Sequence, residues 1–195
     1  PCQSWVDVSG YDPRSGLYCG LSLLNDGKYS LDAQGGDIGL TVLRSPAYAH
    51  HFPATLKPDG QYRFIDQGEQ VFTLTLLPHS GSWQTAGTVQ RAALLNQPPL
   101  ALQATIHPAG RLPLTDSMIA ISPENILATV VKQAEDGLDL VLRAYECRGE
   151  AVAARIELPK WGRLIHVQFA PWEIKTLRIP SQAELPVIET NMLEE

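Results

Sequence analysis

The chain has few of the features that mark membrane proteins or nucleic-acid binders. It contains no apolar run that approaches the ~20 residues of a membrane-spanning helix. Acidic residues outnumber basic ones, 21 to 15, and the net charge is −6. Because non-specific nucleic-acid binding depends on Lys and Arg side chains that neutralise phosphates, we expect neither a nucleic acid nor a membrane as a partner.

Cysteine is also scarce, with only Cys2, Cys19 and Cys147 in 195 residues. Their number is odd, they lie far apart and none forms a CxxC pair, so the sequence indicates neither a disulfide framework nor a zinc knuckle. A reducing compartment is the simpler interpretation. We therefore predict a cytoplasmic protein whose cysteines act as small buried hydrophobic residues.

Helical and βαβ patterns are nearly absent, which excludes a helical bundle and a doubly wound parallel fold. The sequence predicts an all-β protein in two parts, residues 1–110 and 111–195, joined by a linker rich in Pro and Gly at 107–116. Short runs with turn residues between them predict a small β-sandwich in the second part. These runs are 118–121, 126–133, 138–147, 151–158, 164–169 and 173–179.

The first part has strand-like runs and one helical segment. Runs at 4–9, 17–24, 38–43, 70–77 and 100–106 predict strands, and the Gly35-Gly36 pair predicts a hairpin turn. The period changes over 83–95, which predicts the one notable helix, capped by Ser80 or Ser82 and ended at Asn96. The long Pro- and His-containing stretch 45–68 is predicted to be a lid or an insertion.

The turn Asn25-Asp26-Gly27-Lys28 is the best candidate site. Short polar side chains and Gly favour a chain reversal there, and the run 38–43 ends on Arg44. We expect Asn25, Asp26, Lys28 and Arg44 to lie together at one end of a sheet. They would offer acceptors beside cationic donors to a polyhydroxyl ligand. The alternative, a polar turn with solvated Lys and Arg, stays open.

Other chemistries have weaker support. Asp66 and Glu69 could pair as glycosidase carboxylates, but acidic residues are common in such turns. His50, His51, His79 and His107 lack metal-ligand spacing, so loop histidines are favoured. Neither Ser80 nor Cys147 stands in a nucleophile motif. We therefore predict no catalytic residue and no metal ligand in this chain.

The four tryptophans could stack on sugar rings or fill the core. Core or interface filling is favoured for Trp83 and Trp172 because large aromatic residues dominate burial. Trp161, in the turn Pro159-Lys160-Trp161-Gly162, is predicted to be the most exposed of the four.

Several segments, in order, resemble a known family. LSLLNDGKYS, LTVLRSP, DQGEQVFTLTLLPHSGSW, AGTVQRAALLNQP, VVKQAEDGLDLVLRAYECRG and PWEIKTLRI are similar to the C-terminal β-region of glycoside hydrolase family 38, the α-mannosidases. The resemblance is strongest to the cytosolic and bacterial branch, with its turn of the LLNDxKYG type. It implies part of a large antiparallel, galactose-mutarotase-like super-sandwich, followed by a small C-terminal β-sandwich.

The resemblance also implies a function. It makes the chain a piece of an α-mannosidase that cleaves α-mannosidic bonds with retention. Missing parts of that enzyme would then cover unpaired strand edges, and Glu195 would be the natural C-terminus. The zinc ion and the aspartate nucleophile would belong to the N-terminal catalytic domain, and no HxD motif stands here. The chain, inactive alone, would then support that partner domain and help to line the α-mannoside cleft.

For the site residues the resemblance implies a cleft rim or a domain interface, with Asn25, Asp26, Lys28, Tyr29, Arg44 and His79 as the candidates. Two other functions stay open. A freestanding carbohydrate-binding module would need an exposed aromatic strip, and a structural β domain would form a homo-oligomer.

Overall fold

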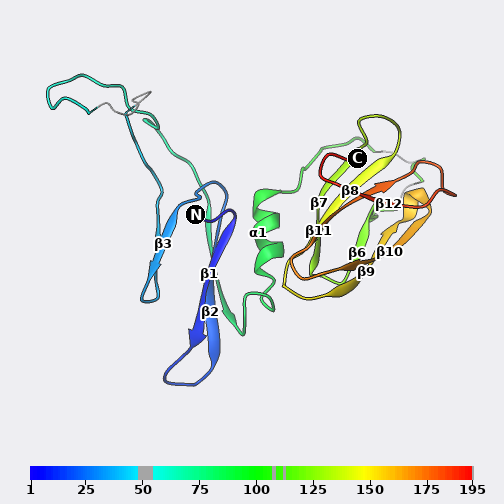
Figure 1. Cartoon of the computed structure of the whole chain (residues 1–195), viewed down its shortest axis with the longest axis horizontal. Helices are drawn as coiled ribbons and strands as arrows, with labels where there is room; N and C mark the ends of the chain where they lie inside the picture. The colour runs from blue at the N-terminus through cyan, green and yellow to red at the C-terminus, as the bar shows by residue number, and fades with distance from the viewer. Residues whose placement is uncertain (48–54, 107–108, 112, 195) are drawn as a thin grey trace. The chain divides into compact units, whose positions relative to one another are not determined.

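A computed structural model describes residues 1–47, 55–106, 109–111 and 113–194 and divides the chain into two compact units, Pro1–Ala101 and Leu102–Glu195 (Figure 1). Strand pairs in the described residues are antiparallel, and one α-helix accompanies them. The predicted all-β class with one helix is confirmed. The boundary expected between residues 110 and 111 stays a prediction. No helix in the described part of the chain is long and apolar enough to cross a membrane.

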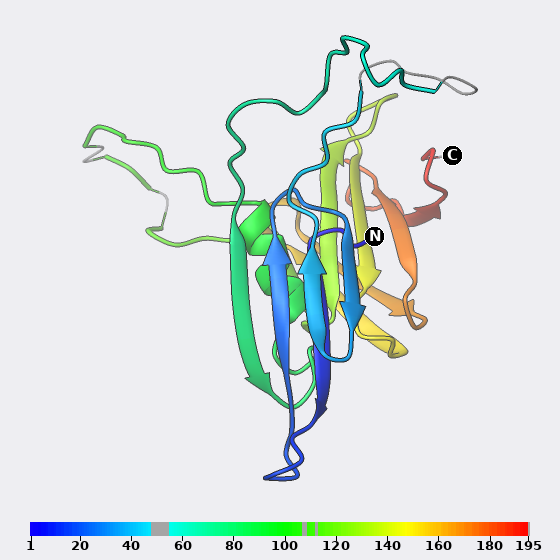
Figure 2. The same ribbon diagram turned by 90° about the vertical axis from the view of Figure 1, so that its left-hand side faces the viewer.

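The first unit is built on a three-stranded sheet. Its strands are β1 (Trp5–Tyr11), β2 (Tyr18–Asn25) and β5 (Leu74–Ser80), in the order β1-β2-β5. Helix α1 (Thr88–Asn96) packs on β2 and β1 and covers one face of the sheet (Figure 2). The alternation of β2 sets its two faces. Ser22 and Leu24 point to the helix, while Leu21 and Leu23 point to the opposite face.

Helix α1 is attached to the sheet at both of its ends. Near its N-terminus the hydroxyl groups of Ser22 and Thr88 lie 2.8 Å apart, and neither residue is exposed. Near its C-terminus the Asn96 amide donates to the Asn25 carbonyl oxygen at 3.0 Å. The first of these hydrogen bonds is buried and the second is partly buried, and together they fix the helix in register with β2.

A small hairpin completes the first unit. Strands β3 (Leu31–Gln34) and β4 (Asp37–Leu40) pair through the predicted Gly35-Gly36 turn as a separate two-stranded sheet. The run predicted at 38–43 therefore ends at Leu40 and does not share a sheet with β2. Beyond the hairpin, the predicted lid or insertion lies partly outside the described residues, and Ala47 and Phe64 form an isolated bridge on either side of that gap.

Three predictions for this unit are wrong in detail. The helix starts at Thr88 and not at Trp83, because Gly87 adopts a left-handed φ of 66° and no side chain caps the helix. Strand β5 starts at Leu74 and runs on through His79, which was predicted to be a loop histidine. The apolar stretch 100–106 forms no strand, and its Leu100 and Ile106 are 84% and 91% exposed. A strand needs a partner, which local sequence does not supply.

The second unit is a β-sandwich, as predicted. One sheet has the order β10-β9-β6 and the other β12-β11-β8-β7. The strands are β6 (Ala120–Ser122), β7 (Ile126–Gln133), β8 (Leu140–Glu146), β9 (Val152–Leu158), β10 (Arg163–Phe169), β11 (Ile174–Ile179) and β12 (Ile188–Thr190), with a short 3-10 helix η1 (Pro159–Trp161). Between the sheets lies a core that includes Leu142, Ile156, Leu177 and Phe169.

Candidate functional site

The structure brings three of the predicted site residues to one polar pocket. Lys28, Tyr29 and Arg44 line a space of about 360 Å³, together with Asp66 and Gln70. The backbone N–H of Thr41 donates to the Ser30 carbonyl oxygen at 2.9 Å, which brings the segments 28–30 and 41–44 side by side. Two cationic residues, a tyrosine and an aspartate therefore line one space. We refer to it as the polar pocket.

Asn25 supports the turn beside this pocket but does not line the pocket. Its side-chain oxygen accepts hydrogen bonds from the backbone N–H groups of Gly27, at 3.2 Å, and Lys28, at 2.8 Å. Its amide nitrogen donates to the carbonyl oxygen of Gln3 at 3.2 Å. Asn25 is only 1% exposed. These bonds form a local turn of the kind that Asn favours, so Asn25 orients Lys28 but cannot contact a ligand.

Asp26 has a structural partner on another segment. Its carboxylate accepts a hydrogen bond from the backbone N–H of Thr73 at 2.8 Å. That bond is the main cause that lowers the pKa of Asp26, and the nearby Lys28 charge adds to it. The Lys28 ammonium lies 4.9 Å from the centre of the Phe72 ring, in a cation–π contact. The turn is thus joined to the segment that leads into β5.

His79, the sixth predicted residue, lies far from the polar pocket. It pairs with Gly20 on β2, whereas Asn25 is at the other end of that strand. The Nε2 of His79 lies 2.7 Å from the Asp7 carboxylate, and Nδ1 lies 3.1 Å from the carbonyl oxygen of Gly81. A carbonyl oxygen only accepts, so Nδ1 donates to it. Both ring nitrogens are therefore occupied.

The group around Asp7 is a buried polar network. The Asp7 carboxylate accepts hydrogen bonds from the hydroxyls of Ser9 and Ser22 as well as from His79. Burial acts to raise the pKa of Asp7, but these hydrogen bonds outweigh it and lower the pKa. Neither serine is hydrogen-bonded to His79. The network therefore lacks the nucleophile–base contact of a hydrolytic triad.

A zinc ion does not fit the residues that the structure describes. No group of three or more His, Cys, Asp or Glu side chains among them could hold a metal ion. Of the histidines considered as ligands, His79 has both nitrogens occupied, and His50, His51 and His107 lie outside the described residues. The described residues therefore offer no site for a metal ion.

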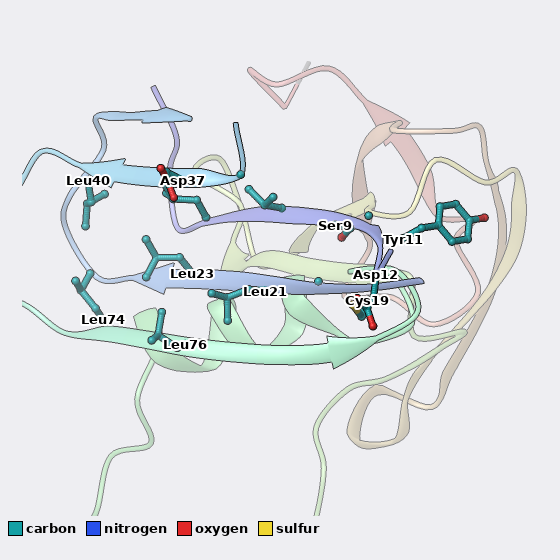
Figure 3. Close-up of a pocket in the computed structure, with 15 residues that line it drawn as sticks. Ser9, Tyr11, Asp12, Cys19, Leu21, Leu23, Asp37, Leu40, Leu74 and Leu76 are labelled. Carbon is teal, nitrogen blue, oxygen red and sulfur yellow. The ribbon is translucent and has the colours of Figure 1, made fainter. Parts of the chain in front are cut away.

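A second pocket, which the sequence did not predict, lies on the sheet face opposite α1. Leu21, Leu23, Leu74 and Leu76 of the sheet and Leu40 of the hairpin line a space of about 720 Å³ (Figure 3). Leu76 is 64% exposed and Leu74 is 40% exposed. The alternating leucines of β5 and β2 were the signal for this face. We call it the apolar pocket.

Tryptophan burial differs from the prediction. Trp172 is 58% exposed and Trp161 only 36%, so core filling by Trp172 is wrong, and so is the prediction that Trp161 is the most exposed tryptophan. Trp5 and Trp83 pack together with ring centres 4.9 Å apart, which agrees with a packing role for Trp83.

Known proteins resemble the chain in sequence. No family model matches it. Over 158 residues it is 37% identical to α-mannosidase 2C1 of Homo sapiens, covering 79% of this chain and 13% of that protein. Over 153 residues it is 35% identical to α-mannosidase G of Dictyostelium discoideum, and this match covers 75% of this chain and 12% of that protein. The chain therefore spans about an eighth of the length of the curated relatives it matches.

Solved structures share its fold. A protein in glycosyl hydrolase family 38 from Enterococcus faecalis matches with a TM-score of 0.72 and 20% identity, over 91% of this chain and 22% of that chain. An α-mannosidase from Enterococcus faecalis V583 matches with a TM-score of 0.70 and 19% identity, over 91% of this chain and 21% of that chain. At these identities the likeness establishes the fold.

Relatives and fold agree, and together they define the chain as a β-sandwich region of a glycoside hydrolase. These findings confirm the resemblance to the C-terminal β-region of glycoside hydrolase family 38 that its segments predicted.

Proposed function

We propose that the chain is the C-terminal, non-catalytic portion of an α-mannosidase that hydrolyses α-mannosidic bonds with retention. The observation that carries this proposal is the match at 35–37% identity, across at least three quarters of the chain, to proteins named α-mannosidases. The chain alone lacks a hydrolytic group with suitable partners in its described residues. Its role is then to support a catalytic domain of the same polypeptide and to complete the carbohydrate cleft.

The apolar pocket supports the scaffolding part of this proposal. A sheet is stable when both of its faces are covered, yet α1 covers only one face of β1-β2-β5. Leu21, Leu74 and Leu76 remain between 36% and 64% exposed on the other face. The catalytic domain, or the strands that join it to this chain, would cover these leucines.

The polar pocket supports the cleft-lining part. Lys28 and Arg44 are donors, Asp66 is an acceptor, and Tyr29 adds a hydroxyl and a ring that is 57% exposed. Sugar hydroxyls act as both donors and acceptors, so this combination can bind them. The zinc ion would lie in the catalytic domain, and the free state of Cys2, Cys19 and Cys147 supports a cytoplasmic location.

Activity of the complete polypeptide tests the proposal. The reading frame that contains these residues is expressed in full and assayed with an aryl α-mannoside, next to the 195-residue chain and an aryl β-mannoside as controls. We expect turnover of the α-mannoside by the complete polypeptide only. A complete polypeptide that folds and binds zinc but does not cleave the α-mannoside would overturn the proposal.

A second candidate function is a freestanding carbohydrate-binding module, which would use exposed aromatic residues to bind sugars. Trp172 and Tyr11 are 58% and 75% exposed, but Tyr11 and Trp172 belong to different units. Saturable binding of mannose oligosaccharides to the chain, followed by tryptophan fluorescence, would favour that function. Light scattering at several concentrations would test the homo-oligomeric alternative.

A further inference from the structure

Trp172 combines high exposure with an unusual backbone conformation. It is 58% exposed, and its φ of 62° lies in the left-handed region that bulky residues rarely adopt. Such a conformation costs free energy and persists only where its surroundings impose it. An exposed indole gains little from burial in return. The position therefore calls for an explanation beyond the stability of the second unit.

A buried carboxylate imposes this conformation. Glu146 is 0% exposed, and one of its oxygens accepts a hydrogen bond from the Trp172 backbone N–H at 3.1 Å. The same oxygen accepts from the N–H groups of Gly149 and Glu150, at 2.7 and 3.1 Å. The other oxygen accepts from the N–H of Arg148 and from the Asn125 amide, both at 2.8 Å. Five donors thus hold one charge at the base of the turn.

The indole of Trp172 packs closely against the backbone of Gly149. A Cβ atom added to Gly149 would lie 2.6 Å from Cζ2 and 2.7 Å from Cε2 of Trp172. Only a residue without a side chain allows this approach. The indole therefore packs on the β8–β9 turn and is held in one orientation, while more than half of the residue stays accessible.

A row of apolar and aromatic residues crosses the sheet at the same end as Trp172. Leu127 on β7 pairs with Tyr145 on β8, which pairs with Ile174 on β11. Paired residues on neighbouring strands lie on the same face, and Ile174 is 58% exposed. Trp172 lies two residues before Ile174, at the same end of the sheet. In this row only Tyr145 carries a hydroxyl group that could bind a sugar.

We infer that Trp172, with the row Leu127–Tyr145–Ile174, is the anchor of an interface with an apolar surface of the remaining α-mannosidase polypeptide. The inference rests on the proposed function, since the partner lies outside this chain. Its relatives are roughly six times longer, and the matched structures continue for almost four fifths of their length outside the match. Trp and Tyr are residue types that are enriched in interface hot spots, and a protein partner accounts for the aliphatic members of the row better than a sugar does.

Hydroxyl-radical footprinting tests this assignment. The complete polypeptide and the 195-residue chain are exposed to the same radical dose, and oxidation at each tryptophan is measured by mass spectrometry. We expect oxidation of Trp172 to be about fivefold or more slower in the complete polypeptide, because hot-spot residues are fully desolvated. Trp161, in the same unit and 36% exposed, is the matched control and should change little.

The outcomes separate this inference from the proposed function. Equal oxidation of Trp172 in both proteins would overturn the interface, even where the complete polypeptide cleaves an aryl α-mannoside. A protected Trp172 in an inactive polypeptide would support the interface and count against the mannosidase. An equal decrease at Trp161 would overturn Trp172 as the anchor. Protection of Trp172 in the 195-residue chain by methyl α-mannoside would replace the protein partner with a sugar.

Discussion

The imidazole of His79 on β5 reaches the carboxylate of Asp7 on β1, at 2.7 Å, although β2 runs between these two strands. Gly20 on β2 makes this contact feasible. A Cβ atom there would lie 2.7 Å from Cε1 of His79 and 2.6 Å from Oγ of Ser9. The hydrogen bond between His79 and Asp7 therefore bridges the sheet over a position that has no side chain.

Replacing Gly20 with Ala should destabilise the first unit by about 1–3 kcal/mol, because the methyl group would overpack the space under His79. Hydrogen exchange at the amides of β2 measures the opening free energy of this unit separately from the sandwich. Gly10→Ala, in β1 with no atom within 4 Å of the added Cβ, should have little effect. Equal protection in both variants would mean that the His79 contact is not built on Gly20.

The Asp7–His79 pair should show strong coupling in a double-mutant cycle. His79→Ala leaves the carboxylate buried with hydroxyl partners only, and we expect it to cost about 3 kcal/mol. Asp7→Asn in addition should restore part of the loss, since the second change removes the unpaired charge. Hydrogen exchange at the amides of β1 and β5 measures the loss of stability in the single variant and in the double variant. Strictly additive effects would contradict a direct interaction.

Glu146 should make the second unit sensitive to acid. Burial acts to raise its pKa, but hydrogen bonds from Trp172, Arg148 and other donors outweigh it and hold the pKa of Glu146 below the usual 4.5. A lowered folded-state pKa means that this stabilisation is present above pH 4.5 and is lost as the pH falls through the folded-state pKa.

Glu146→Gln should therefore cost about 2–3 kcal/mol at pH 7, the range for hydrogen bonds to a charged group. The difference from the unmodified protein should shrink as the pH falls below 4.5. Urea unfolding of the second unit between pH 7 and pH 3 measures both effects. Glu150→Gln, at an exposed position in the same turn, is the control and should leave the profile unchanged.

In the complete polypeptide, Arg44→Ala should raise KM for an α-mannoside by about tenfold, the cost of one lost hydrogen bond with a charged donor. Arg44 lines the polar pocket. Arg14→Ala, at an exposed position that does not line it, is the matched control. Steady-state kinetics give KM and kcat separately. Unchanged kinetics with Arg44→Ala would remove the polar pocket from the cleft.

The chain alone should neither cleave an aryl α-mannoside nor bind a stoichiometric zinc ion, because its described residues offer no metal-binding cluster. Isothermal titration with zinc chloride and an activity assay with and without a chelator check both expectations. Zinc binding at one equivalent would contradict this view of the chain.

Sequence patterns predicted the strands of the second unit well, because these strands alternate regularly and turn residues separate them. The predicted run 126–133 is strand β7 without any shift. In the first unit the same patterns were less informative. Leucines of β2 and β5 alternate on a sheet of which α1 covers only one face, and the stretch 100–106 has strand composition but no strand partner among the described residues.

The candidate site shows the same division. The Asn25 turn and its approach to Arg44 could be predicted, because turn chemistry is local. That Asn25 is buried, and that His79 lies at the other end of the sheet, could not, since both follow from the register of β5 on β2.

By itself the sequence determined the all-β class, the single helix, the turn at Asn25 and the resemblance to α-mannosidases, because these depend on residue order and local preference. Only the tertiary structure decided that Gly20 lets His79 meet Asp7, that Glu146 holds Trp172 outward and that one leucine face stays open. Each of these joins residues far apart in the chain, and strand register, which local sequence does not fix, brings them together.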